Sequence, residues 1–188
     1  MLKNLILLHR YYRRFDQSVP VPMELLREMV DAARISGSAK NMQPLKYMLF
    51  NDPADCARIF PTPAWAGYLK DWPGPEEGER PTAYIVQLGD LDLTDDWWCD
   101  DGIAAQSMML TAVEKGFGGC IIGSVQREKL RSILSIPDRY KIIQVLALGK
   151  PAEKVVLDEV SDGDITYWRD EQGVHHVPKR SLDELIIG

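Results

Sequence analysis

Apolar side chains recur along this chain at two spacings, one typical of helices and the other of strands. Residues 19–35 have the helical spacing, with apolar side chains at Met23, Leu26, Met29 or Val30, and Ala33. Pro22, just before them, suits the first helical position. Residues 102–116 predict a second, largely apolar helix that ends at Gly116, which favours a central position or a subunit interface. Residues 126–137 predict a third helix, at the surface.

The strands are predicted by short apolar runs bounded by turn residues. Residues 47–50 are followed by Asn-Asp-Pro, and residues 83–90 end in a turn. Residues 142–149 predict a buried strand, and residues 119–124 a short strand or a crossing loop. Strands separated by helices indicate an α+β or an α/β domain.

The whole chain, residues 1–188, is predicted to be one domain. With 188 residues, 45% of them hydrophobic, it is long enough to bury roughly 70% of the surface that the unfolded chain exposes. Residues 61–81 are rich in Pro and Gly and lack a period, which predicts an ordered excursion or lid. Residues 151–188 predict an extended tail, in which Ser181 and Glu184 form a capping box for a last short helix.

Charge and hydropathy narrow the class of protein. A net charge of −6 argues against binding to nucleic acid or to anionic lipid. No apolar run approaches the ~20 residues that a membrane span needs. The apolar residues 5–8 are too few for a signal peptide and are followed by arginines, so we expect a cytoplasmic protein. The three cysteines, Cys56, Cys99 and Cys120, are far apart, which indicates reduced, mostly structural thiols.

Several familiar chemistries are missing from the sequence. The glycine run at residues 116–123 follows a helix and enters a strand, the reverse of the order in a dinucleotide-binding fold. No P-loop and no Gly-x-Ser-x-Gly elbow is present. His175 and His176 are adjacent, so in an extended segment they point in opposite directions, and we expect both to face solvent. No metal site is predicted.

A basic cluster near the N-terminus stands out in this acidic protein. Residues 9–15, HRYYRRF, place Arg10, Arg13 and Arg14 together. One interpretation is a solvated helix end. The other is a phosphate clamp, because guanidinium groups match phosphate oxygens bidentately. Lys179 and Arg180, near the other terminus, leave the same two interpretations open.

Five motifs, in order along the chain, carry a resemblance to a known family. They are residues 10–15 (RYYRRF), 37–44 (GSAKNMQP), 102–106 (GIAAQ), 116–118 (GFG) and 149–151 (GKP). From about His9 to Leu185 the chain resembles the FMN-dependent nitroreductase family. The matching family motifs are Arg-Ser-x-Arg-x-Phe, Pro-Ser-x-x-Asn-x-Gln-Pro, Gly-Ile-Ala-Ala-Gln, Gly-Leu-Gly and Gly-x-Pro.

The resemblance implies an α+β fold in which helices flank a central, mostly antiparallel sheet. It also implies a homodimer with a C-terminal extension and a flavin site shared between the chains. The implied cofactor is FMN, with NADH or NADPH as co-substrate. No catalytic side chain is expected, because the flavin N5 accepts and returns the hydride.

The resemblance also assigns site residues. The phosphate ligands would be Arg10, Arg13, Lys179 and Arg180, with Tyr11 where the family has a small Ser. Ser38, Asn41 and Gln43 would contact the isoalloxazine, after a Gly37 that replaces the family's Pro. Backbone around Ile122, Gly123 and Ser124 would lie near the reacting edge of the ring.

Four tryptophans fall in the middle third of the chain: Trp65, Trp72, Trp97 and Trp98. They either form an aromatic wall for a flat substrate or pack at a dimer interface or under the excursion. Cys99 and Asp100 are candidates for the rim of the same pocket.

The leading functional hypothesis is an oxidoreductase that passes hydride from NAD(P)H through FMN to a small organic acceptor, such as a nitro compound or a quinone. Two alternatives stay open. One is a flavin-binding carrier or sensor without turnover. The other is a branch of the same fold that fragments reduced flavin or removes halogen from tyrosines.

Overall fold

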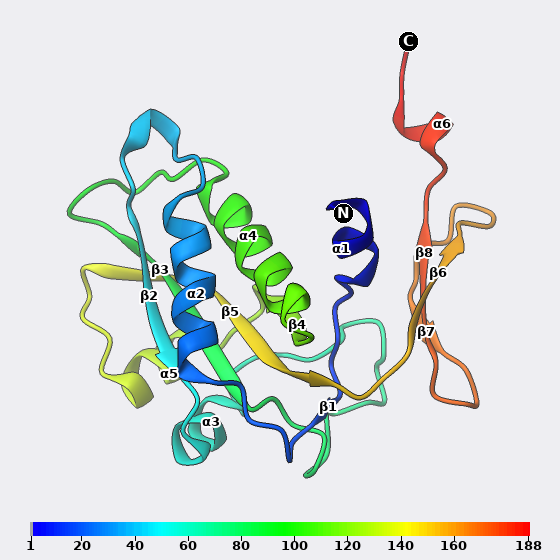
Figure 1. The fold of residues 1–188 in the computed structure, drawn as a ribbon, viewed down its shortest axis with the longest axis horizontal. Coiled ribbons are helices and arrows are strands. Elements are labelled where there is room, and N and C mark those ends of the chain that lie inside the picture. The colour runs from blue at the N-terminus through cyan, green and yellow to red at the C-terminus, as the bar shows by residue number, and fades with distance from the viewer. Residues whose placement is uncertain (1) are drawn as a thin grey trace.

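The computed structural model describes residues 2–188, and a five-stranded antiparallel sheet forms its centre (Figure 1). The strands are β1 (Phe15–Asp16), β2 (Leu45–Phe50), β3 (Ala83–Asp90), β4 (Gly118–Ile122) and β5 (Tyr140–Pro151). Their order is β1-β5-β3-β2, and β4 also pairs with β5. Every ladder in this sheet is antiparallel, as expected.

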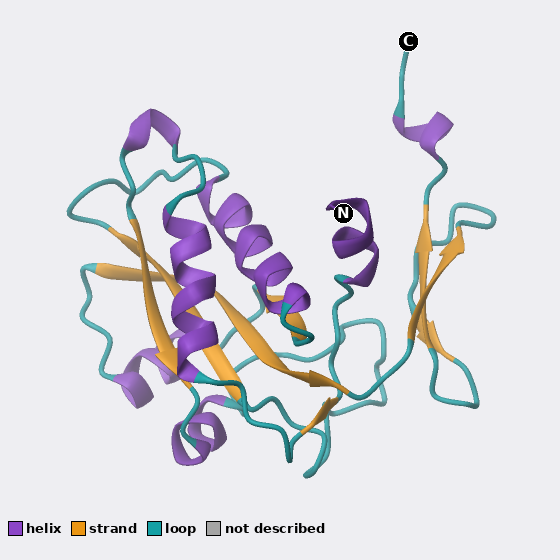
Figure 2. Cartoon of the chain, in the orientation of Figure 1, coloured by secondary structure: helices purple, strands orange, loops and turns teal. Residues whose placement is uncertain are grey.

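Helices cover both faces of the sheet. The covering helices are α2 (Met23–Arg34), α3 (Pro53–Ile59), α4 (Asp100–Glu114) and α5 (Arg127–Leu134). The helix α1 (Leu2–Leu8) packs against α4, and α6 (Leu182–Leu185) protrudes at the C-terminal end (Figure 1). Figure 2 shows α2 and α4 side by side in front of the strands. Their apolar faces form one core with alternate residues of the strands, and α3 and α5 form a second core on the opposite face. The helices α2 to α5 therefore lie where their apolar faces are buried, whereas α1 and α6 have no buried residue.

The local patterns predicted the main elements well. The strand at residues 83–90 is confirmed in full, and all eight of its residues are buried because helices cover both faces of the sheet. The apolar helix is α4, and its central position is confirmed by the burial of Ala105, Met108 and Met109. Some bounds differ from those predicted: Pro22 is the N-cap of α2 and Met23 its first residue, α4 begins at Asp100, and α5 ends at Leu134.

The glycine run serves strand packing. A Cβ at Gly119 would lie 2.0 Å from the carbonyl oxygen of Ala147 on β5, so only glycine lets β4 approach so closely. The carbonyl of Gly119 accepts a hydrogen bond from the main-chain N–H of Tyr12 at 3.0 Å. This contact fixes the N-terminal basic segment on the edge of the sheet.

The segment at residues 61–81 is ordered but contains no helix or strand. Its end is fixed to the N-terminal segment, because the Gln17 side chain accepts hydrogen bonds from the main-chain N–H groups of Gly78 at 2.8 Å and Arg80 at 3.2 Å. The N–H of Phe15 donates to the carbonyl of Glu79. Within residues 2–188, no helix has the length and apolar character needed to cross a membrane.

The tail contains a second sheet that was not predicted from sequence. Its strands β6 (Val155–Glu159), β7 (Trp168–Arg169) and β8 (His175–Lys179) form a second sheet, in which β8 pairs parallel with β6 and antiparallel with β7. The paired residues of β6 and β8 are about twenty positions apart in the sequence, and such pairing leaves no pattern among neighbouring residues. Of the predicted capping box, the serine half is present, because the Ser181 hydroxyl accepts from the N–H of Glu184 at the start of α6. The Glu184 carboxylate pairs with Arg180 instead of returning a bond to Ser181. Figure 1 shows α1 between α4 and this tail sheet.

Candidate functional site

A cavity of about 390 Å³ lies where α1, the segment after it, α4 and the tail sheet meet. The residues that line it are Ile6, His9, Arg10, Tyr11, Arg13, Gln106, Val155, Tyr167, His175, Val177 and Lys179. The structure thus brings together four of the residues predicted to hold a phosphate: Arg10, Tyr11, Arg13 and Lys179. We call this space the cationic cavity.

The charge of the cationic cavity is unusual for an acidic chain. Among residues 2–188, three cations line it, Arg10, Arg13 and Lys179, and no carboxylate does. The Arg13 guanidinium lies over the ring of Tyr167, 4.8 Å from the centroid, and its Nη1 is 3.1 Å from Nε2 of His175. A site with an excess of positive charge and preformed donors suits an anionic ligand.

Glu153 fixes the backbone that carries Arg13. Its Oε1 accepts hydrogen bonds from the main-chain N–H groups of Arg13 and Arg14, the second at 3.1 Å. Its Oε2 pairs with Nη2 of Arg169 at 2.9 Å, and this ion pair is almost completely buried. Because one carboxylate joins the N-terminal basic segment to β7, the tail sheet helps to position the cations.

Arg14 points away from the cationic cavity. Its Nε pairs with Glu79 at 3.2 Å, and its guanidinium lies 5.9 Å from the ring of Trp72. The same Trp72 ring packs against the Arg169 guanidinium at 4.2 Å. The N-terminal cluster therefore divides into arginines that line the cavity and one that holds the 61–81 segment in place.

Two buried histidines in the cationic cavity were not predicted from sequence. His175 is 1% exposed and His9 is 7% exposed, so the expectation that His175 faces solvent is wrong. Burial and the charge of the neighbouring arginine, Arg10 for His9 and Arg13 for His175, lower the pKa of both to about 4. Nε2 of His9 and Nδ1 of His175 have no hydrogen-bond partner among residues 2–188. A bound ligand would give these polar atoms a partner.

His176 has the opposite surroundings, as expected for the next residue of a strand. Its ring stacks on Trp168 with centroids 4.1 Å apart. Its Nδ1 is 2.8 Å from Asp158 and its Nε2 3.3 Å from Asp170. Desolvation lowers the pKa of His176, but these two carboxylates outweigh it and raise the pKa overall. His176 thus holds the three tail strands together.

A second cavity, of about 190 Å³, adjoins the first. It is lined by Tyr11, Arg13, Ala64, Trp65, Ala66, Gly67, Cys120, Ile121, Ile122, Gly123, Ser124 and Tyr167. Tyr11, Arg13 and Tyr167 belong to both cavities. The predicted ring-edge residues, Ile122 to Ser124, are therefore close to the predicted phosphate ligands within one chain.

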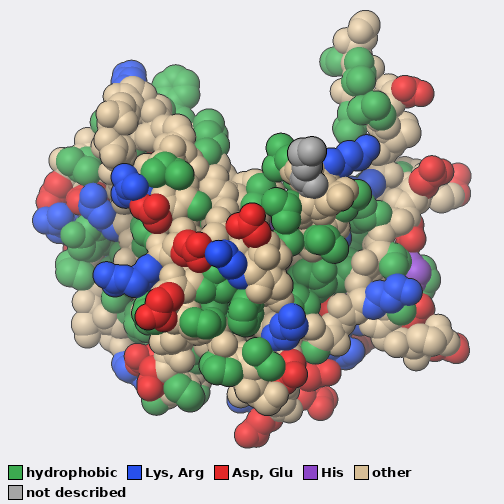
Figure 3. Space-filling view, viewed as in Figure 1, with side chains coloured by type: hydrophobic (Ala, Val, Ile, Leu, Met, Phe, Trp, Pro, Cys, Tyr) green, Lys and Arg blue, Asp and Glu red, His purple; other side chains and the backbone are tan. Residues whose placement is uncertain are grey.

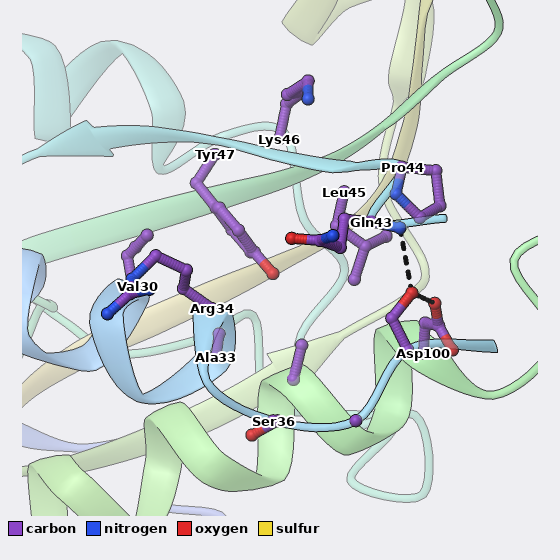
Figure 4. A pocket seen from close by; sticks show the side chains of 13 residues that line it. Val30, Ala33, Arg34, Ser36, Gln43, Pro44, Leu45, Lys46, Tyr47 and Asp100 are labelled. Atoms are coloured by element: carbon purple, nitrogen blue, oxygen red, sulfur yellow. Dashed lines mark hydrogen bonds between the residues drawn. The ribbon is translucent and has the colours of Figure 1, made fainter. Parts of the chain in front are cut away.

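The predicted ring-contact loop lies elsewhere in the chain. Ser38 and Gln43 line a third cavity, of about 260 Å³, between the end of α2, the start of β2 and the start of α4. Figure 4 shows Gln43, Tyr47 and Asp100 around this space. It shares no lining residue with the other two cavities. Asn41 is exposed beside it.

The remaining predicted residues are scattered. Arg180 is exposed and pairs with Glu184 of α6. Of the four tryptophans, the second cavity includes only Trp65. Trp97 packs on Gly89, and the Lys141 ammonium lies 5.1 Å from its ring, whereas Trp98 is 71% exposed. Cys99 is exposed, and Asp100 lines the third cavity. One chain therefore does not gather the tryptophans into a wall.

Sequence analysis missed Glu153, Gln106, Tyr167 and His175 as parts of the site. Gln106 ends the GIAAQ motif at residues 102–106, but the motif gave it no role in the site. The other three come from segments without a matching motif, and tertiary packing brings all four to the basic segment. Among residues 2–188, no three His, Cys, Asp or Glu side chains are grouped so that they could hold a metal ion.

Comparison with known proteins agrees with this architecture. The family model described as the nitroreductase family matches residues 7–76 and 78–150. A Bacillus subtilis strain 168 protein, YodC, described as an NAD(P)H nitroreductase, is 24% identical over 73% of this chain and 83% of its own.

Two solved structures are similar in fold. One is a nitroreductase family protein from Clostridium novyi NT, with a TM-score of 0.67 and 19% identity over 98% of both chains. The other is an FMN-dependent nitroreductase from Clostridium difficile R20291, with a TM-score of 0.63 and 21% identity over 78% of this chain and 85% of that one. The family model covers well over half of the residues, including the basic segment and the central sheet. The chain therefore belongs to the nitroreductase family.

Proposed function

We propose that this protein is an FMN-dependent oxidoreductase that takes hydride from NAD(P)H and passes it to a small organic acceptor, such as a nitro compound or a quinone. The observation that carries the proposal is the cationic cavity, where Arg10, Arg13 and Lys179 meet without a carboxylate. Relatives described as an NAD(P)H nitroreductase and as FMN-dependent support the same assignment.

The residues of the cationic cavity fit the phosphate of FMN. A phosphate monoester carries about −1.5 to −2 charges at neutral pH and three acceptor oxygens. Arg10 and Arg13 supply guanidinium donors, and Lys179 supplies an ammonium. The unpartnered nitrogens of His9 and His175 supply further donors, since a neutral imidazole carries one N–H. The bound phosphate would offset the positive charge that the chain gathers here.

The adjoining cavity fits the flavin ring. Its walls combine the backbone of residues 122–124 with Trp65, and it continues from the cationic cavity past Tyr11 and Arg13. Bound FMN supplies the redox chemistry, accepting a hydride from NAD(P)H and returning it to the acceptor. The chain itself binds and orients the two substrates and excludes water. Asn41 and Gln43 would meet the ring from a second copy, because their loop lies apart from both cavities.

We expect a homodimer. Apolar side chains are exposed on the two terminal helices and the last residues: Leu2, Ile6, Leu7, Leu8, Leu182, Leu185, Ile186 and Ile187. Ile187 is 96% exposed, and Figure 3 shows hydrophobic side chains on the protruding C-terminal segment. Apolar surface concentrated in this way favours association. Sedimentation at micromolar concentration should give about twice 21.3 kDa.

Leu185→Glu combined with Ile187→Glu should shift the sedimenting mass toward one chain, because the introduced charges cannot be buried without a partner. Leu93→Glu changes an exposed leucine outside these segments and should leave the mass unchanged. A monomeric wild type that holds FMN tightly would contradict the shared site.

We expect ping-pong kinetics. If one open face of the ring serves both substrates, the oxidised nicotinamide must leave before the acceptor enters. Initial rates at several acceptor concentrations should then give parallel double-reciprocal lines. Each half-reaction should also run alone, so NAD(P)H should bleach the yellow protein without acceptor. Intersecting lines would indicate a ternary complex, and a protein that binds FMN but is never bleached would instead be a carrier or sensor.

A further inference from the structure

The loop between α2 and β2 has a backbone that must be held in place. Lys40, Asn41 and Gln43 have φ angles of 51°, 55° and 50°, in the left-handed region that residues with a side chain rarely adopt. All three residues are exposed, so their own side chains are not packed into a core. Strained conformations of this kind persist only where the surrounding structure fixes them.

Asp100, the first residue of α4, supplies the fixed point. It is 4% exposed, and its two carboxylate oxygens both reach the loop. Oδ2 accepts from the Ser38 hydroxyl at 2.6 Å, and Oδ1 accepts from the N–H of Ala39 at 2.9 Å. The Ser38 oxygen in turn accepts from the N–H of Gln43 at 3.0 Å. Figure 4 shows these bonds joining Gln43 to Asp100.

The charge of Asp100 is stabilised without a salt bridge. No Lys, Arg or His among residues 2–188 lies within ion-pair distance of its carboxylate. Its place at the N-terminus of α4 puts the carboxylate at the positive end of the helix dipole. The Tyr47 phenol lies nearby, where burial and the charge of Asp100 raise its pKa to about 12. Asp100 is thus a dedicated anchor for loop residues 38–43.

This geometry gives Ser38 a different role from the predicted contact with the isoalloxazine. Its hydroxyl has one proton, which goes to Asp100, and one of its lone pairs is taken by the N–H of Gln43. It has no second proton for a ring oxygen or nitrogen. The side chains of residues 40–43 are all exposed on the loop surface. The Gln43 amide uses one N–H on the main-chain carbonyl of Asn41 at 3.2 Å, which leaves its second N–H and its oxygen for a ligand.

We propose that Asp100 is a positioning residue, which acts through the Ser38 hydroxyl and the N–H of Ala39 to hold residues 39–43 in the conformation that meets the flavin ring of a second copy. Ser38 is then a link within the chain, and the ring contacts come from Asn41 and Gln43. The inference rests on the proposed function, since it takes the flavin ring as the ligand of this loop.

Amide hydrogen exchange on the cofactor-free protein tests the positioning. Asp100→Asn keeps the size of the side chain, but its carboxamide has one acceptor oxygen in place of two. We expect exchange at Ala39 and Gln43 to accelerate on the order of tenfold, as for the loss of one charge-assisted bond. The matched control is Asp101→Asn, which removes the same charge one residue later. Among residues 2–188, the Asp101 carboxylate accepts a hydrogen bond only from the N–H of Gly102 in its own helix. Unchanged exchange in Asp100→Asn would overturn the proposal.

FMN affinity and flavin potential test whether the position of the loop affects the bound flavin. Asp100→Asn should weaken FMN affinity about tenfold, and the midpoint potential of the bound flavin should become more negative because donors to the reduced ring are displaced. Loss of the carboxylate charge alone would shift the potential the other way. Asp101→Asn should change neither quantity. A less negative potential in Asp100→Asn would overturn positioning in favour of a direct charge effect.

A double-mutant cycle identifies the route. If Asp100 acts through Ser38, Ser38→Ala should have nearly the same effect on FMN affinity as Asp100→Asn. The double variant should then bind FMN only slightly more weakly than either single variant. Additive effects would overturn the link. Arg13→Ala separates this inference from the proposed function. If Arg13→Ala weakens FMN binding and Asp100→Asn does not, only the inference fails, and if wild type binds no FMN, both fail.

Discussion

Replacing Glu153 with alanine is expected to destabilise the protein by about 3–5 kcal/mol, because removing one partner of a buried ion pair leaves the other charge without compensation. The side chains of Glu153 and Arg169 are only 2% and 11% exposed, so water cannot replace the lost contact. The main-chain N–H groups of Arg13 and Arg14 also lose their acceptor. The measurement is urea unfolding at one protein concentration, which keeps any association constant.

Two variants sharpen the result. Glu171→Ala removes the same charge from an exposed position in the tail and should change the free energy of unfolding by less than about 0.5 kcal/mol. Glu153→Gln keeps a carbonyl acceptor, so its free energy of unfolding should lie between those of wild type and Glu153→Ala. If Glu153→Ala is as stable as Glu171→Ala, Glu153 does not anchor the basic segment.

The second large effect is expected at Arg13. Losing a charge-assisted hydrogen bond costs about 1.5–3 kcal/mol, so Arg13→Ala should weaken FMN affinity about ten- to a hundredfold. Riboflavin, which lacks the phosphate, should bind wild type and variant about equally. Fluorescence quenching of each flavin on titration with protein measures both affinities.

Arg14→Ala is the matched control for Arg13. It removes the same charge from the next residue, but the Arg14 guanidinium contacts Glu79 and Trp72 outside the cationic cavity. FMN affinity should therefore change little. Equal affinity of Arg13→Ala and wild type for FMN would return the cluster to its simplest interpretation, a solvated helix end.

The family and the central elements could be predicted from sequence because their signals are local. The apolar run at residues 83–90 determines a strand buried on both faces, and the spacing from Met23 to Ala33 determines a helix with one apolar face. The loop motif at residues 37–44 and the arginines at 10 and 13 identified the candidate loop and the cationic segment. These features depend only on near neighbours in the chain.

The tertiary structure decided which of these groups meet. Arg13 and His175 are 162 residues apart, and Ser38 and Asp100 are 62 apart, yet each pair is within hydrogen-bond distance. The burial of His175, the tail sheet and the Glu153 anchor follow from pairings of the same kind, which no local period records. A polar side chain has the same letter in the sequence whether it is solvated or buried. Only the fold removes water from around Glu153 and Asp100, and that desolvation makes their few hydrogen bonds decisive for the site.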